Sequence, residues 1–168
     1  MGKITWDQAV KNGMFAYYHR DKYAYFYGAK GQVLTDELMD YFISAEPAHF
    51  KKFSKEELKA VKDFSRGKIG LDCSAFTGWI CTGDKQYSAG QIANCSKTTT
   101  DLVAGVAGSI LYTTFGGTGR HIAIDIGYGY FLHCPSEGHT IELGKILDYP
   151  WEISGQSNCV DYSGDNNR

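Results

Sequence analysis

A cysteine stands where the sequence predicts the start of a helix, a position that favours nucleophilic chemistry. Three apolar side chains follow Cys73 at helical spacing, and these are Phe76, Trp79 and Ile80. Asp72 precedes the helix, where its side chain can cap the first turn, and Ser74 adds a hydroxyl. The helix dipole favours thiolate over thiol, so we expect Cys73 to alkylate fastest of the cysteines at mildly acidic pH. The N–H groups of the first turn, including that of Cys73, also suit an oxyanion.

Two histidines at the ends of a predicted hairpin can supply a base for this thiol. His121 begins the apolar run His-Ile-Ala-Ile-Asp-Ile-Gly, and His133 ends the run Tyr-Phe-Leu-His. The turn between the runs contains two glycines, so antiparallel pairing would bring the two imidazoles close together. One ring would accept the proton of Cys73 while the other orients it. His139 is the alternative to His133 if the register of the hairpin differs.

The remaining candidate ligands give no pattern of a metal site. Thiolate and imidazole bind zinc, so Cys73, His121 and His133 define a conceivable site, but the sequence lacks a local chelating pair. We predict no metal and no cofactor. The total of five cysteines is odd and includes no Cys-x-x-Cys pair, which argues against a disulfide framework or zinc ribbon. The cysteines predicted as core or surface thiols are Cys81, Cys95, Cys134 and Cys159. The histidines without a partner at motif spacing, predicted to lie at the surface or to be satisfied within the fold, are His19, His49 and His139.

Helices are predicted in the first half of the chain. Thr5 and Gln8 have capping-box spacing ahead of a short helix that Gly13 would end. Residues 15–27 are rich in aromatic side chains, and we expect an extended or irregular segment there. Thr35 is predicted to cap a second helix that Pro47 limits. The spacing of Ser54 and Glu57 predicts a third helix, which Gly67 would end.

Strands are predicted in the second half. Short apolar runs separated by glycines span residues 109–115, 121–126, 130–134 and 140–143, a pattern typical of an antiparallel meander. Helices followed by strands indicate the α+β class. We predict a single domain over residues 1–168, with a core at about 15–162 and a polar tail at 163–168.

Composition excludes two classes of partner. The formal net charge is −2 and no dense Lys/Arg cluster occurs, so nucleic acid is not expected to bind. No run approaches the roughly 20 apolar residues of a membrane-spanning helix. The start, MGKITWDQAV, has no basic region followed by an apolar run, so we predict no export signal within this sequence.

Two motifs resemble those of the NlpC-type cell-wall peptidases of the papain-like superfamily. Leu71-Asp72-Cys73-Ser74 resembles the family's Asp-Cys-Ser helix start, and the ten residues from His121 to Tyr130 resemble its His-Val-Gly-Ile-Tyr-Ile-Gly-x-Gly strand pair. The likeness covers residues 70–133 and extends more faintly back to residue 23. It implies a papain-like α+β fold of NlpC type, in which N-terminal helices and the nucleophile helix pack on an antiparallel sheet.

The resemblance also implies roles for individual residues. Cys73 would be the nucleophile, His121 the general base and acid, and His133 the orienting residue. Asp72 and Ser74 would receive a free amino terminus of the substrate. The family's Tyr-x-Trp-Gly-Gly signal has a looser counterpart at residues 25–29, where Tyr25 and Tyr27 would contact substrate. Apart from the resemblance, Arg120 is a candidate for bidentate binding of a substrate carboxylate.

Three departures from the family pattern concern specificity more than chemistry. Ala75 replaces the glycine usual after Asp-Cys-Ser. Residues 31–68 form a long helical insertion, and residues 103–110 lack a Pro-Gly-Asp signature.

The activity implied by the resemblance is amide hydrolysis through a thioester. The expected substrate is the peptidoglycan stem peptide, cut between D-glutamate and the diamino acid. Alternatives with the same nucleophile are an N-acetylmuramoyl-L-alanine amidase or an acyl transferase, and a different alternative is a catalytically silent wall-binding module. We expect a monomer that acts in the bacterial cell wall, outside the cell or as a phage-encoded endolysin, after cytoplasmic synthesis.

Overall fold

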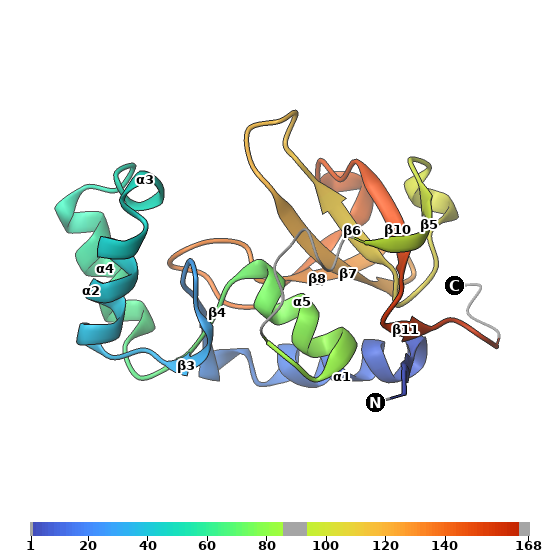
Figure 1. Ribbon diagram of the computed structural model, residues 1–168, viewed down its shortest axis with the longest axis horizontal. Helices are drawn as coiled ribbons and strands as arrows, with labels where there is room; N and C mark the ends of the chain where they lie inside the picture. Colours follow the sequence, from blue (N-terminus) through green and yellow to red (C-terminus); the bar gives the residue numbers. More distant parts are fainter. Residues whose placement is uncertain (1, 86–93, 165–168) are drawn as a thin grey trace.

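The computed structural model describes residues 2–85 and 94–164, with helices mainly in the first half of the chain and strands mainly in the second (Figure 1). The helices are α1 (Trp6–Tyr18), α2 (Asp36–Ala45), α3 (Pro47–Phe50), α4 (Lys55–Ser65) and α5 (Cys73–Thr82), with short 3-10 turns at Arg20–Lys22, Leu102–Ala104 and Ile146–Asp148. The strands are β1 (Ile4–Thr5), β2 (Tyr23–Tyr25), β3 (Lys30–Val33), β4 (Ile69–Leu71), β5 (Cys95–Thr99), β6 (Ile110–Thr113), β7 (His121–Gly127), β8 (Tyr130–His133), β9 (Glu142–Lys145), β10 (Ile153–Ser157) and β11 (Val160–Asp161). The α+β prediction is confirmed.

A six-stranded antiparallel sheet forms the centre of the second half. Its order is β5-β10-β6-β7-β8-β9, so the predicted meander of β6 to β9 is confirmed. Strands β5 and β10 were not predicted. Their sequences are Cys-Ser-Lys-Thr-Thr and Ile-Ser-Gly-Gln-Ser. Both are rich in polar residues and carry no continuous apolar run, so their place follows from pairing with β6 rather than from their own composition.

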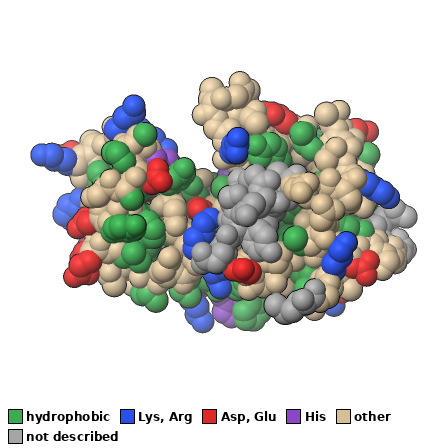
Figure 2. All heavy atoms as spheres, in the orientation of Figure 1, with side chains coloured by type: hydrophobic (Ala, Val, Ile, Leu, Met, Phe, Trp, Pro, Cys, Tyr) green, Lys and Arg blue, Asp and Glu red, His purple; other side chains and the backbone are tan. Residues whose placement is uncertain are grey.

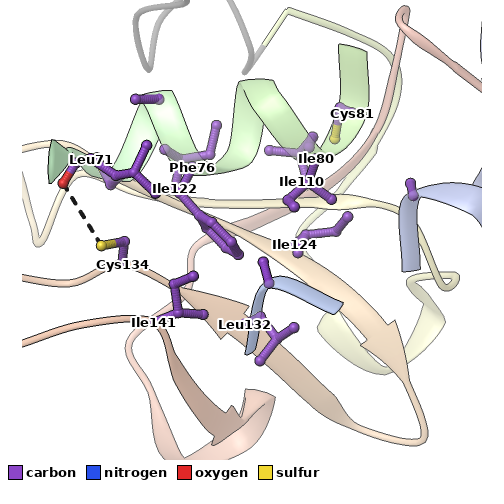
Figure 3. Close-up of a cluster of buried hydrophobic side chains, with 14 of the residues drawn as sticks. Leu71, Phe76, Ile80, Cys81, Ile110, Ile122, Ile124, Leu132, Cys134 and Ile141 are labelled. Carbon is purple, nitrogen blue, oxygen red and sulfur yellow. Dashed lines mark hydrogen bonds between the residues drawn. The ribbon is translucent and has the colours of Figure 1, made fainter. Parts of the chain in front are cut away.

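The helix that begins at Cys73 packs on one face of this sheet. Phe76 and Ile80 of α5 point toward Ile122 and Ile124 of β7 in the main core (Figure 3). Leu132 of β8 joins the same cluster. The predicted buried helix is confirmed, and its burial fixes the position of its first residue relative to β7.

Helix α1 corrects two predictions. It continues through Gly13 to Tyr18, so the helix does not end at Gly13 and the aromatic residues 15–18 are helical rather than extended. A Cβ at Gly13 would lie 3.2 Å from Leu132 Cδ1, which shows that this glycine provides space for close helix–sheet packing. Trp6 and Ala9 lie in the main core, so the packed region starts earlier than the expected boundary near residue 15.

Helices α2, α3 and α4 form a separate group, at the left in Figure 1. The Thr35 cap and the Ser54–Glu57 capping box are both confirmed. Gly67 follows α4 with a φ of 80°, the left-handed conformation expected after a helix. This group has its own buried cluster, which includes Phe26, Leu34, Met39, Phe42, Phe50 and Val61.

A three-stranded sheet in the order β2-β4-β3 joins the helical group to α5. Tyr25 pairs with Leu71 on one side of β4, and Lys30 pairs with Leu71 on the other. The end of β4, immediately before α5, is therefore flanked by both neighbouring strands. At the far end of the molecule, β1 pairs with β11. Residues 165–168 of the predicted polar tail lie outside the described residues. Among the described residues, no helix is long and apolar enough to cross a membrane.

Candidate active site

Cys73 lies at the junction of β4 and α5. Asp72 is the N-cap of the helix, and its Oδ1 accepts a hydrogen bond from the N–H of Ala75 at 2.7 Å. Cys73 is 9% exposed. The backbone N–H groups of Ile122 and Ser74 lie close enough to its sulfur to oppose a rise of its pKa. The thiol therefore lies against the start of β7, next to Ile122, which follows His121 in the sequence.

The β7–β8 hairpin brings His121 and His133 together. Ile124 pairs with Leu132, and since strand residues alternate between faces, both histidines lie on the opposite face of the hairpin. Nε2 of His121 is 2.8 Å from Nδ1 of His133, and the two residues are only 4% and 5% exposed. Because Nε2 is engaged, Nδ1 is the ring nitrogen of His121 that remains for a proton from a thiol.

His139 does not take the place of His133. Its Nδ1 lies 2.5 Å from a carboxylate oxygen of Glu142, and its side chain is 53% exposed. The register of the hairpin thus selects His133 as the partner of His121.

Aromatic side chains enclose the histidine pair. Trp151 stacks on His121 with ring centroids 5.5 Å apart, and Phe115 stacks on it at 6.1 Å. Tyr149 meets His133 edge-on at 5.2 Å. Tyr149 and Trp151 were not among the predicted site residues. The motif Tyr-Pro-Trp just before β10 is a local signal of aromatic enrichment, but only the pairing of β10 with β6 brings it to the site.

Burial sets the protonation of both imidazoles. Desolvation lowers the pKa of His121 to about 4. It also lowers the pKa of His133 to about 3, with further contributions from the charges of His121 and His139. Both rings are therefore neutral at neutral pH, the state in which a ring nitrogen can accept a proton.

The thiol is likewise neutral in the resting site. Burial, followed by the negative charge of Asp72, raises the pKa of Cys73 to about 12, against the opposing influence of the Ile122 N–H, the Lys30 charge and the Ser74 N–H. Burial thus opposes the thiolate that the helix terminus was expected to favour, and selective alkylation of Cys73 at mildly acidic pH stays a prediction. Desolvation outweighs the helix terminus because the sulfur is almost fully enclosed.

Asp72 and Ser74 bind a lysine that the sequence analysis did not single out. Lys30 Nζ lies 3.0 Å from Oδ1 and 2.9 Å from Oδ2 of Asp72, and it donates to Ser74 Oγ at 2.8 Å. Lys30 belongs to β3, more than forty positions before Asp72, so sequence spacing gives no sign of this contact. The residues predicted to receive an amino group do hold one, but it comes from the chain itself.

A cleft of about 640 Å³ leads to His121 from the surface. Its lining residues are Tyr25, Tyr27, His49, Lys52, Phe115, Gly117, Thr118, Gly119, Arg120, His121, Pro135 and Tyr149. The predicted substrate-contact residues Tyr25, Tyr27 and Arg120 are among them. The surface is hollowed between the helical group and the loop that joins β6 to β7 (Figure 2).

Both walls of the cleft are held by buried or multiply bonded carboxylates. On one side, Nε2 of His49 lies 2.6 Å from Glu137, and the His49 ring stacks on Tyr27 at 4.0 Å. His49 is thus a histidine satisfied within the fold, by a partner 88 positions away in the sequence. On the other side, Glu152 accepts hydrogen bonds from the N–H groups of Thr114 and Gly116, both at 3.1 Å. These bonds fix the start of the glycine-rich loop that carries Arg120.

The fold is similar to those of several known proteins. The NlpC/p60 domain of the peptidoglycan hydrolase SagA matches 91% of this chain and 99% of its own, with a TM-score of 0.53 and 18% sequence identity. NlpC1 from Trichomonas vaginalis matches 90% of this chain and 44% of its own, with a TM-score of 0.50 and 13% identity.

In sequence, Protein P54 of Enterococcus faecium is 30% identical over 90 residues, or 48% of this chain and 16% of P54. The chain thus spans about one sixth of the length of this relative. No protein-family model matches the chain. The structural similarities, which extend over nine tenths of the chain, show that it has the NlpC/p60 fold.

Proposed function

We propose that this chain is a cysteine hydrolase that cleaves bacterial peptidoglycan stem peptides at the amide between the γ-carboxyl of D-glutamate and the diamino acid. The observation that carries the proposal is the enclosed thiol of Cys73 near Ile122 of β7, together with the hydrogen bond between the adjacent His121, which lines a cleft, and His133. The fold shared with a domain of a peptidoglycan hydrolase supports the substrate class.

The first half of the reaction forms a thioester. Because the resting site holds a thiol and a neutral imidazole, Nδ1 of His121 takes the sulfur-bound proton as the sulfur of Cys73 attacks the amide carbon. The N–H of Cys73 at the helix start donates to the oxyanion. His121 then protonates the leaving amine, and the C–N bond breaks.

The second half releases the acid. A water molecule attacks the thioester while Nδ1 of His121 takes one of its protons. The C–S bond breaks, and the leaving sulfur of Cys73 recovers the proton from His121. Throughout, the Nε2–H of His121 donates to Nδ1 of His133, which holds the ring in one orientation and favours the protonated intermediate.

The charge of the cleft fits an anionic peptide. Lys52 and Arg120 are among the residues that line it, and the described lining residues include no Asp or Glu. A glutamate joined through its γ-carboxyl keeps a free α-carboxylate, which a guanidinium can bind through two parallel hydrogen bonds.

We therefore expect Arg120→Gln to raise KM about tenfold, the value of one charge-assisted hydrogen bond at a partly exposed site, with kcat changed less than about threefold. Steady-state kinetics on a stem peptide would measure both constants. Arg20→Gln is the matched control, since Arg20 lies over Tyr17 away from the cleft-lining residues. An unchanged KM in Arg120→Gln would remove Arg120 from the substrate site.

The bond that is cut is tested by product masses. Purified muropeptides are incubated with the wild-type chain and with Cys73→Ala, and the products are analysed by mass spectrometry. The expected product pair carries a new carboxyl on D-glutamate and a new amino group on the diamino acid, and it is absent with Cys73→Ala. Release of free L-alanine amino termini from muramic acid would instead identify an amidase. Acyl adducts of an added amine would identify a transferase, and intact muropeptides would favour a silent binding module.

A further inference from the structure

The Asp72–Ser74 pair beside the nucleophile is an ammonium-binding site, and Lys30 occupies it. Oδ1 of Asp72 accepts from Lys30 Nζ at 3.0 Å, from Ser74 Oγ at 2.8 Å and from the N–H of Ala75 at 2.7 Å. Oδ2 lies 2.9 Å from the same ammonium group. Both oxygens of the carboxylate are thus engaged, and a second ammonium group would meet a carboxylate whose charge is already neutralised.

The lysine is delivered to this place by the backbone. Lys30 pairs with Leu71 across β3 and β4, and the N–H of Asp72 donates to the carbonyl of Ala29 at 3.1 Å. The strand that carries the ammonium group is therefore bonded directly to the residue that binds it. Because this ligand is tethered, its effective concentration is far above that of an amine in solution.

The pair is also largely withdrawn from water. The side chains of Lys30 and Asp72 are 21% and 13% exposed. At this depth an ion pair is screened less than one at the surface. A substrate amine would have to compete with Lys30 for the same carboxylate, and separating Lys30 from Asp72 breaks a partly buried ion pair, which is costly.

From this geometry we infer that Lys30 is a specificity-determining residue, and that the preferred substrates are peptides whose amino terminus is acylated rather than free. The inference rests on the proposed peptidase function and narrows its substrate class. A peptide still joined through its amino terminus to a larger structure meets this condition, because its terminal nitrogen is an uncharged amide that needs no carboxylate partner.

The test uses one stem peptide in two forms, with a free and with an acetylated amino terminus. The wild-type chain is expected to cleave the acetylated form with a kcat/KM at least about tenfold higher, since a displaced ion pair of this kind is worth more than one factor of ten. Lys30→Met, which keeps the length of the side chain and removes its charge, is expected to shift this ratio at least about tenfold toward the free form. Lys30→Arg is expected to keep the acetyl preference.

The ratio of the two substrates is internal to each variant, so a general loss of stability does not imitate the result. Lys11→Met is the matched control, because Lys11 pairs with Asp7 on the exposed side of α1. A wild-type preference for the free amine, or an unchanged ratio in a folded Lys30→Met, would overturn the inference while leaving the peptidase intact. Failure of the wild type to cleave either peptide would overturn the proposed function, and the inference with it.

Discussion

Replacement of Cys73 by alanine is expected to lower kcat/KM on a stem peptide by at least about 10⁴-fold. The loss is this large because the variant has no atom that can form the thioester, and the remaining donors and the cleft can only bind and polarise the substrate. The measurement is a rate assay with enough enzyme to detect the residual turnover. Mass spectrometry of the wild-type chain after rapid acid quenching is expected to detect an acyl group on Cys73.

Cys159→Ser is the control for this experiment. Cys159 is half-buried beyond β10 and does not line the cleft, so its substitution is expected to leave kcat/KM within about twofold of wild type. Substantial turnover by Cys73→Ala, or an acyl group on Cys81, Cys95, Cys134 or Cys159, would refute the assignment of the nucleophile.

Removal of the hydrogen-bonding group of His133 is expected to have the second largest effect. His133→Leu should lower kcat about 10² to 10³-fold with little change in KM, because the His121 ring loses the partner that fixes its orientation. His133→Asn offers a carbonyl oxygen to Nε2–H and is expected to recover most of this loss. Steady-state kinetics of the wild type, His133→Leu and His133→Asn separates the effect of losing the hydrogen bond from the effect of losing side-chain packing.

The pH profile provides a second readout for the same pair. Desolvation lowers the pKa of His121 to about 4, and only the neutral ring accepts a proton. In the wild type, kcat/KM is therefore expected to stay on its plateau at about pH 6, where an ordinary imidazole is mostly protonated, and to fall as the pH decreases through about 4.

The stability of the fold changes with pH in the same direction. Because the folded pKa of His121 lies below the unfolded value near 6.5, the unfolded chain binds more protons between these values and the free energy of unfolding decreases as the pH falls. Circular dichroism at each pH separates unfolding from loss of the base.

His19→Leu is the matched control, since Nδ1 of His19 lies 2.8 Å from the carbonyl of Phe15 on α1, away from the cleft-lining residues, and its loss should leave both the rate and the profile unchanged. An acid limb centred near 6.5 in the wild type, or equal activity of His133→Leu and His133→Asn, would contradict the positioning role.

Local signals in the sequence were sufficient to predict much of the arrangement. The Asp72 cap, the capping box at Ser54 and the apolar alternation from His121 onward each specify an element within a few residues. The order of these elements along the chain, with Cys73 at a helix start and His121 and His133 on a hairpin, then indicates which side chains can meet. These predictions depend on contacts that are short in sequence, so they need no knowledge of the rest of the chain.

The parts that were missed depend on contacts between distant segments. Lys30 reaches Asp72 only because β3 pairs with β4, and Trp151 reaches His121 only because β10 pairs with β6. Gly13 looked like a helix stop, but its role is to leave room for Leu132 of β8. In each case the decisive contact is with a segment far away in the sequence, so the neighbouring residues give no sign of it.

The enclosure of Cys73 has a consequence for its durability. Peroxides and disulfides react with thiolates, and a thiol whose pKa is raised to about 12 contains very little thiolate at neutral pH. The unreacted protein therefore keeps its sulfur in a form that oxidants attack slowly, while a bound substrate gains a proton acceptor in His121 at the moment of attack. Burial thus slows oxidation of the nucleophile between turnovers.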